Sequence, residues 1–85
     1  MNGTTVRWSE SAVKDLQRLD SVNQRRVANV IARFVDTSEG EVKRLQGPLG
    51  AEYRLRAGGL RIRFQITPDD TIVILRVLPR DKAYR

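Results

Sequence analysis

Residues 53–66 read YRLRAGGLRIRFQI, which is two alternating segments joined by a pair of glycines. Alternation of apolar and polar residues predicts strands with one face toward a core, and Gly58-Gly59 provides a turn compatible with positive φ. The stretch therefore predicts an antiparallel hairpin. Its polar side chains must then share the face away from the core, and they are Arg54, Arg56, Arg61, Arg63 and Gln65.

Further strands are predicted on both sides of this hairpin. After a turn at residues 68–70, residues 71–78 are almost all aliphatic or β-branched, as in a central strand. Residues 4–8 alternate and predict a short first strand. Residues 41–51 contain two glycines near a proline and predict a connection between elements.

Two helices are predicted between the first strand and this connection. Apolar residues at helical spacing predict one helix over residues 10–19, with Ser9 as its N-cap. A second helix follows over residues 21–37, and Ser21 and Gln24 have the spacing of a capping box. So short a connection between the two helices favours a helical hairpin.

The predicted element order is β-α-α-β-β-β, an α+β fold in which a helical hairpin packs on a mainly antiparallel four-stranded sheet. With 85 residues, of which 40% are hydrophobic, the chain is expected to form one domain over residues 1–85.

The composition excludes several classes of protein. The chain has no cysteine and no histidine, so disulfides, thiolate zinc sites and Ser-His-Asp catalysis are impossible. Its carboxylates form no cluster in the sequence, so we expect neither a metal nor a cofactor. No apolar run is long enough for a membrane span, and no signal peptide is visible at the N-terminus. We therefore expect a cytoplasmic protein without a membrane partner.

The positive charge is concentrated in the second half of the chain. Residues 1–42 carry six basic and six acidic side chains, whereas residues 43–85 carry ten basic and four acidic ones. The whole excess of +6 therefore lies in residues 43–85. A one-sided excess indicates a polyanion as partner, and the planar guanidinium of arginine suits phosphate. The alternative is a charge that only maintains solubility.

Three segments together resemble the RelE/ParE toxin superfamily, and in particular its RelE-like branch. They are KRLQG at residues 43–47, YRLRAGGLRIRF at 53–64 and VLPRDKAYR at 77–85. The resemblance spans nearly the whole chain. It implies a toxin of a type II toxin–antitoxin system that cleaves mRNA in the ribosomal A site by attack of a ribose 2′-OH on the adjacent phosphate. Its expected partners are an antitoxin encoded next to it and the ribosome with its mRNA.

The resemblance also implies which residues act. Arg54 and Arg56 match the paired basic residues of the second strand, and Arg61 matches a phosphate-stabilising arginine. Arg80 matches a late arginine that stabilises the transition state or protonates the leaving group, and Tyr84 matches a tyrosine that orients the base. Lys82 is a further candidate for RNA contact from the resemblance. Alternation of the strands by itself adds RNA or phosphate contacts of Arg63, Arg76, Lys43 and Arg44, on or beside the face away from the core.

Two questions stay open at this point. Several RelE relatives have lysines where this chain has Arg54 and Arg56, and an arginine does not release its proton, so the general base is not identified. Two other functions also fit the sequence: a ParE-like inhibitor of DNA gyrase, and a non-catalytic RNA-binding domain.

Overall fold

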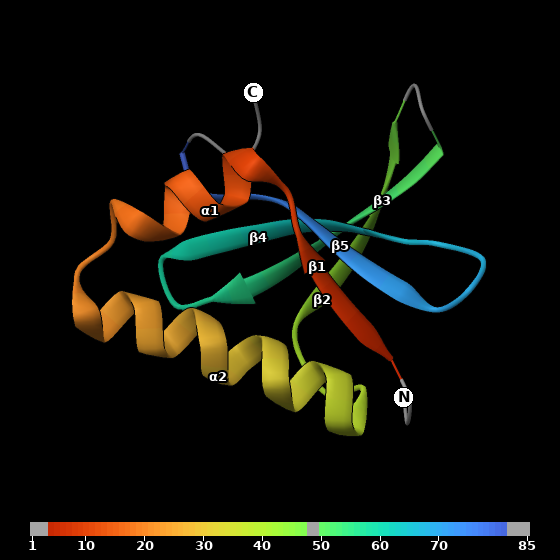
Figure 1. The fold of residues 1–85 in the computed structure, drawn as a ribbon, viewed down its shortest axis with the longest axis horizontal. Helices are drawn as coiled ribbons and strands as arrows, with labels where there is room; N and C mark the ends of the chain where they lie inside the picture. Colours follow the sequence, from red (N-terminus) through yellow and green to blue (C-terminus); the bar gives the residue numbers. More distant parts are fainter. Residues whose placement is uncertain (1–3, 48–49, 82–85) are drawn as a thin grey trace.

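The computed structural model describes residues 4–47 and 50–81, in which two helices pack on one mixed five-stranded sheet (Figure 1). The elements are β1 Thr5–Trp8, α1 Glu10–Gln17, α2 Ser21–Thr37, β2 Val42–Gly47, β3 Gly50–Ala57, β4 Leu60–Ile66 and β5 Thr71–Pro79. The sheet order is β1-β5-β4-β3-β2, and only the β1–β5 pair is parallel. The α+β class and the hairpin of β3 and β4 are confirmed.

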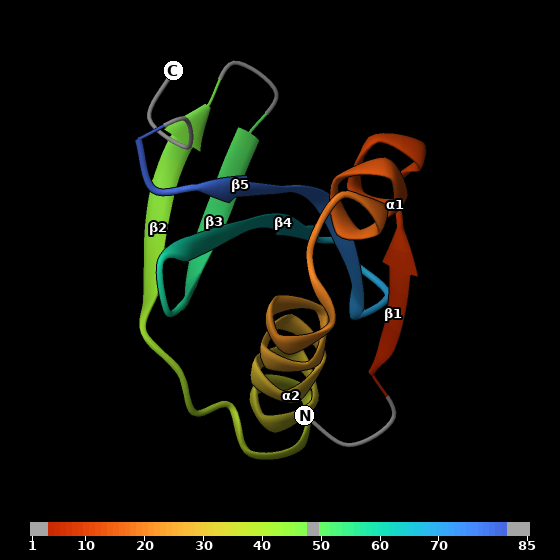
Figure 2. The ribbon, with the colours of Figure 1, turned by 90° about the vertical axis from the view of Figure 1, so that its left-hand side faces the viewer.

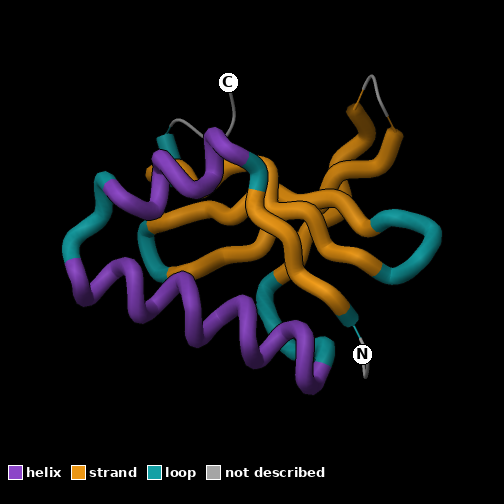
Figure 3. Tube along the Cα trace, in the orientation of Figure 1, coloured by secondary structure: helices purple, strands orange, loops and turns teal. Residues whose placement is uncertain are grey.

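The predicted strand count of four was wrong, because residues 42–47 form β2 rather than a connection. This strand pairs antiparallel with β3 (Figure 3). In this pairing Val42 lies opposite Leu55. It is an edge strand, and its side chains from Val42 to Arg44 are exposed. A strand held by backbone pairing at an edge needs no alternation of apolar residues, so the sequence carries no clear signal for it.

Both helices begin at capped N-termini, one as predicted and one not. The Ala12 N–H donates to Ser9 Oγ at 3.0 Å, which confirms Ser9 as the N-cap of α1. The N-cap of α2 is Asp20 rather than Ser21, since its carboxylate accepts the Asn23 N–H at 2.8 Å. An aspartate caps as well as a serine and adds a favourable charge at the positive end of the helix.

Side chains from both helices and the sheet form a single core. The ring centroids of Phe34 on α2 and Phe64 on β4 lie 5.4 Å apart, and Tyr53 on β3 stacks on Phe64 at the same distance. α2 lies along the hairpin of β3 and β4, whereas α1 lies beside β5 (Figure 2). We call the other side of the sheet, away from this core, the open face.

Beyond the end of β1, side chains at the start of α1 and within it form hydrogen bonds with the edge of β5 that β1 leaves unpaired. The last pair of β1 with β5 joins Trp8 to Ile74, and the next residue, Leu75, is an extra residue in the pairing of β5 with β4. Ser9 Oγ donates to the Leu75 carbonyl at 2.9 Å. Beyond it the buried carboxylate of Asp15 accepts the Val77 N–H at 2.9 Å. A side chain of α1 thus replaces the missing strand partner.

The same carboxylate forms a bidentate ion pair with Arg76. Arg76 Nε and Nη2 donate to the two Asp15 oxygens at 2.8 and 3.1 Å. Burial by itself raises the pKa of Asp15, but the hydrogen bonds from Arg76 and from the Val77 N–H outweigh this effect. The net result is a pKa below the ordinary value of 3.8.

We expect Asp15→Asn to lower the free energy of unfolding by about 1.5 to 3 kcal/mol, because it removes charge-assisted hydrogen bonds to a buried group. Chemical denaturation measures this value. The matched control is Glu10→Gln, which breaks an exposed pair with Lys14 on the same helix and is expected to cost less than about 0.5 kcal/mol. Equal losses in the two variants contradict the assignment.

The difference between wild type and Asp15→Asn should also depend on pH. A pKa lowered in the folded state contributes stability that is complete above the unfolded value, and this stability is lost as pH falls through the folded pKa. The difference in free energy of unfolding should therefore be constant above the ordinary pKa of 3.8 and shrink below it. A difference that persists unchanged down to about pH 2 would show that the Asp15 charge has no part in it.

Candidate functional site

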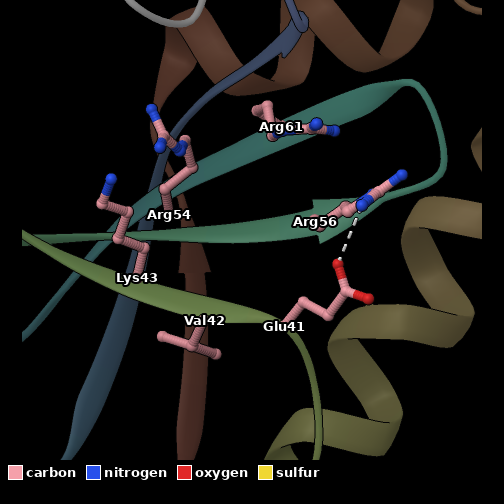
Figure 4. A pocket seen from close by; sticks show the side chains of 6 residues that line it. All are labelled: Glu41, Val42, Lys43, Arg54, Arg56 and Arg61. Atoms are coloured by element: carbon pink, nitrogen blue, oxygen red, sulfur yellow. Dashed lines mark hydrogen bonds and ion pairs between the residues drawn. The ribbon is translucent and has the colours of Figure 1, made fainter.

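A basic pocket of about 210 Å³ lies on the open face, over strands β2, β3 and β4 (Figure 4). We call it the basic pocket, and its lining residues are Glu41, Val42, Lys43, Arg54, Arg56 and Arg61. Four of these side chains are cationic and one is a carboxylate, so at neutral pH they carry a net charge of +3.

The pairing of the strands brings these cations together. Arg54 lies opposite Lys43 on β2, and Arg56 lies opposite Arg61 on β4. Alternation along β3 then places both of its arginines on the open face. Like charges directly opposite each other destabilise a sheet by tenths of a kcal/mol per pair, so this arrangement favours an anionic ligand.

Two of the pocket arginines are held in place by burial. Arg54 is only 6% exposed and Arg61 only 7%. Arg61 Nη1 donates to the carbonyl oxygens of Gly58 and Leu60, each at 3.0 Å, so the guanidinium is fixed against the hairpin turn. These two partners of Arg61 are neutral carbonyls, so they orient its charge without cancelling it. A guanidinium ordered in this way loses little conformational entropy when it binds a phosphate.

Arg56 differs, because a carboxylate of the basic pocket is bound to it. Its Nη1 lies 3.2 Å from Glu41 Oε2, and its backbone N–H donates to the Glu41 carbonyl at 3.0 Å (Figure 4). Both side chains are more than half exposed. An exposed ion pair of this kind contributes little stability, so an incoming phosphate can displace Glu41 at low cost.

Glu41 is not among the predicted site residues, because the sequence predicts a connection over residues 41–51. The sequence carries no clear signal for this placement, since it depends on the antiparallel pairing of residues 42–47 with residues 50–57, which brings the segment before β2 close to Arg56. Recognising the edge strand would therefore have placed a carboxylate among the arginines.

Arg63 and Arg76 stand on the open face in line with Arg54, but each has a carboxylate partner. Arg63 Nε lies 2.7 Å from Glu52 Oε2 in a largely buried pair, and this hydrogen bond raises the pKa of Arg63. Arg76 is bound to Asp15, as described above. Both arginines thus serve as ties within the fold, and their contact with RNA stays a prediction.

The other predicted residues lie around the basic pocket or outside the described chain. Arg44 neighbours Lys43 and so points to the other side of the sheet, opposite Tyr53. Arg80 follows β5, and its backbone N–H donates to the Gly59 carbonyl at 3.0 Å, beside the hairpin turn. Lys82 and Tyr84 lie outside the described residues.

An arginine-rich pocket of this kind can bind a phosphate and stabilise additional negative charge on it. Among residues 4–47 and 50–81, no three carboxylate, Cys or His side chains are placed to hold a metal ion. No helix in this part of the chain is long and apolar enough to cross a membrane.

Known proteins resemble the chain in both sequence and fold. The family model of the ParE toxin of type II toxin–antitoxin systems, parDE, matches residues 6–84. A chain of the archaeal RelE–RelB complex from Pyrococcus horikoshii is 27% identical, with a TM-score of 0.74 and coverage of 93% of this chain and 97% of that chain. A chain of the RelB–RelE complex from Methanococcus jannaschii is 26% identical, with a TM-score of 0.74 and coverage of 92% and 94%.

A bacterial structure shows the same similarity. A chain of the RelBE2 toxin–antitoxin complex from Mycobacterium tuberculosis is 28% identical, with a TM-score of 0.61 and coverage of 89% of this chain and 96% of that chain. Among curated proteins, no sequence matches significantly. The chain belongs to the ParE toxin family of type II toxin–antitoxin systems, and within the RelE/ParE superfamily its structural matches are to the RelE-like branch.

Proposed function

We propose that the protein is a toxin that cleaves mRNA in the ribosomal A site. The observation that carries the proposal is the basic pocket, in which the nearly buried Arg54 and Arg61 stand beside Arg56 and Lys43. The family and the similarity to chains of RelE–RelB complexes support it. The reaction is the attack of a ribose 2′-OH on the adjacent phosphate, which leaves a 2′,3′-cyclic phosphate and a 5′-OH.

In this reaction the arginines act on the phosphate. Arg54 and Arg61 bind its oxygens and stabilise the extra negative charge of the pentavalent transition state. Arg56 joins them when the phosphate displaces Glu41. The resemblance assigns the charge of the leaving oxygen to Arg80, whose backbone N–H is hydrogen-bonded to the hairpin turn. The resemblance assigns the orientation of the base to Tyr84. The 2′-OH loses its proton and the 5′-oxygen gains one, so the net charge of the RNA is unchanged.

We further propose two partners in the cell, an antitoxin encoded next to the toxin and the ribosome with mRNA in its A site. The similar chains from Pyrococcus horikoshii and Methanococcus jannaschii come from complexes of RelE with RelB. The net charge of +6 suits an antitoxin segment that is acidic or amphipathic and wraps the domain. Neither reaction nor partner requires a metal or a cofactor.

A second candidate function is inhibition of DNA gyrase, because the family model that matches the chain is that of the ParE toxin. For this function the toxin would need a surface that binds gyrase, and it would not need a phosphate-binding pocket. The concentration of cations in the basic pocket favours the nuclease over this alternative.

The nuclease proposal is tested with purified protein, translating ribosomes and mapping of the mRNA 5′ ends. We expect cleavage by the wild type and a loss of rate of about 100-fold or more for Arg61→Gln, since one oriented charge at the transition state is worth this much. The matched control is Arg33→Gln on α2, whose side chain pairs with Glu39 outside the basic pocket, and it should cleave at the wild-type rate. Intact mRNA together with inhibition of supercoiling would favour the gyrase alternative.

Glu41→Gln should strengthen the binding of an anion in the basic pocket. The change removes the carboxylate that competes for Arg56, and an exposed pair of this kind corresponds to an increase in affinity of up to about fivefold. NMR titration with inorganic pyrophosphate at low salt measures the affinity. Glu39→Gln is the matched control, because it breaks the exposed pair with Arg33 outside the pocket. The same affinity in both variants would show that Glu41 does not compete with the anion.

A further inference from the structure

The hairpin turn at Gly58-Gly59 is in contact with Arg26 of helix α2, which is not among the predicted site residues. A Cβ on Gly58 would lie 2.8 Å from Arg26 Nη1 and 3.0 Å from Arg26 Cδ, and Gly58 has a positive φ of 61°. Glycine at this position therefore leaves the space that the Arg26 side chain occupies. Arg26 thus joins α2 to the turn between β3 and β4.

The side chain of Arg61 and the backbone of Arg80 also contact this turn through its carbonyl groups. Arg61 Nη1 donates to the Gly58 carbonyl, and the Arg80 N–H donates to the Gly59 carbonyl, each at 3.0 Å. Arg61 also lines the basic pocket, so the pocket and the turn share a cation. The side chains of Arg26 on α2 and Arg61 on β4 therefore meet at one turn of the chain, and the backbone of Arg80 is hydrogen-bonded to the same turn.

No carboxylate compensates these charges within the described part of the chain. Arg26, Arg61 and Arg80 form no ion pair there, in contrast to Arg56 and Arg63, which each bind a glutamate. The side-chain partner of Arg26 is the neutral Asn23 Oδ1 at 3.4 Å, a long hydrogen bond. Two guanidinium groups at one turn, without an ion-paired carboxylate among the described residues, form a site for an anion.

We propose that the Gly58-Gly59 turn, with Arg26 and Arg61, is a second phosphate subsite. It takes the phosphodiester that neighbours the one held in the basic pocket. Arg61 connects the two subsites, so a single-stranded RNA backbone passes from the pocket across the turn to α2. The inference rests on the proposed function, because it takes RNA as the ligand. It assigns to Arg26 a contact with substrate rather than only a packing contact with Gly58.

The test compares Arg26→Met with Arg25→Met in binding to a short single-stranded RNA, measured by fluorescence anisotropy over a range of salt concentrations. Methionine keeps an apolar stem against Gly58 and removes the charge. Arg25 is also exposed on α2, but adjacent helical residues point about 100° apart. We expect Arg26→Met to weaken binding about fivefold at low salt and to reduce the slope of log K against log salt by about 0.7. Arg25→Met should change both values much less.

Equal dissociation constants and equal salt slopes for the two variants would overturn the subsite. Thermal unfolding of each variant shows whether the fold is intact, and Arg26→Gln replaces Arg26→Met if the latter unfolds early. The ribosome assay separates this inference from the proposed function. Cleavage by the wild type with no specific effect of Arg26 refutes the subsite alone. Arg26-dependent RNA binding without any cleavage refutes the nuclease and supports the subsite.

Discussion

The alternation along the β3–β4 hairpin is the constraint on which the rest of the structure depends. Residues such as Leu55, Ile62 and Phe64 must face the helices to be buried, and this burial supplies much of the core. Because successive side chains point to opposite faces, the arginines between them are forced onto the open face. The core and the basic pocket are thus two consequences of the same stretch of sequence, and neither can shift by one residue without destroying the other.

The arginines of the open face differ in their hydrogen-bond partners, which are carboxylates for some and carbonyl groups for others. Arg63 and Arg76 bind carboxylates with little or limited exposure, so their charge is used within the fold. Arg61 is held by carbonyl groups, which orient its guanidinium and leave its charge for a ligand. Arg56 lies between these cases, because its partner Glu41 is exposed and easily displaced. The pocket therefore results as much from where counter-charges are missing as from where arginines are present.

Helix α1 provides hydrogen-bond partners for the edge of β5 that β1 does not cover. Strand β1 covers only the first part of β5, and an uncovered edge leaves backbone N–H groups without partners. Asp15 accepts a hydrogen bond from one of these N–H groups, that of Val77, and also binds Arg76. One buried carboxylate thus connects α1 to the backbone of β5 and to an arginine of the open face. The end of β5, and with it the position of Arg80 beside the hairpin turn, is held by this contact and by pairing with β4.

The sequence by itself determined the helix over residues 21–37, the β4 strand and the face on which Arg54 and Arg61 lie, because periodicity is a local property of the chain. The resemblance in three segments also identified the superfamily that the comparisons confirm. Only the tertiary structure decided that residues 42–47 form an edge strand, since backbone pairing leaves no pattern in side chains. It alone decided which cations are paired, because a partner such as Asp15 lies 61 residues from Arg76. Long-range contacts of this kind depend on how the elements pack, and no local pattern encodes them.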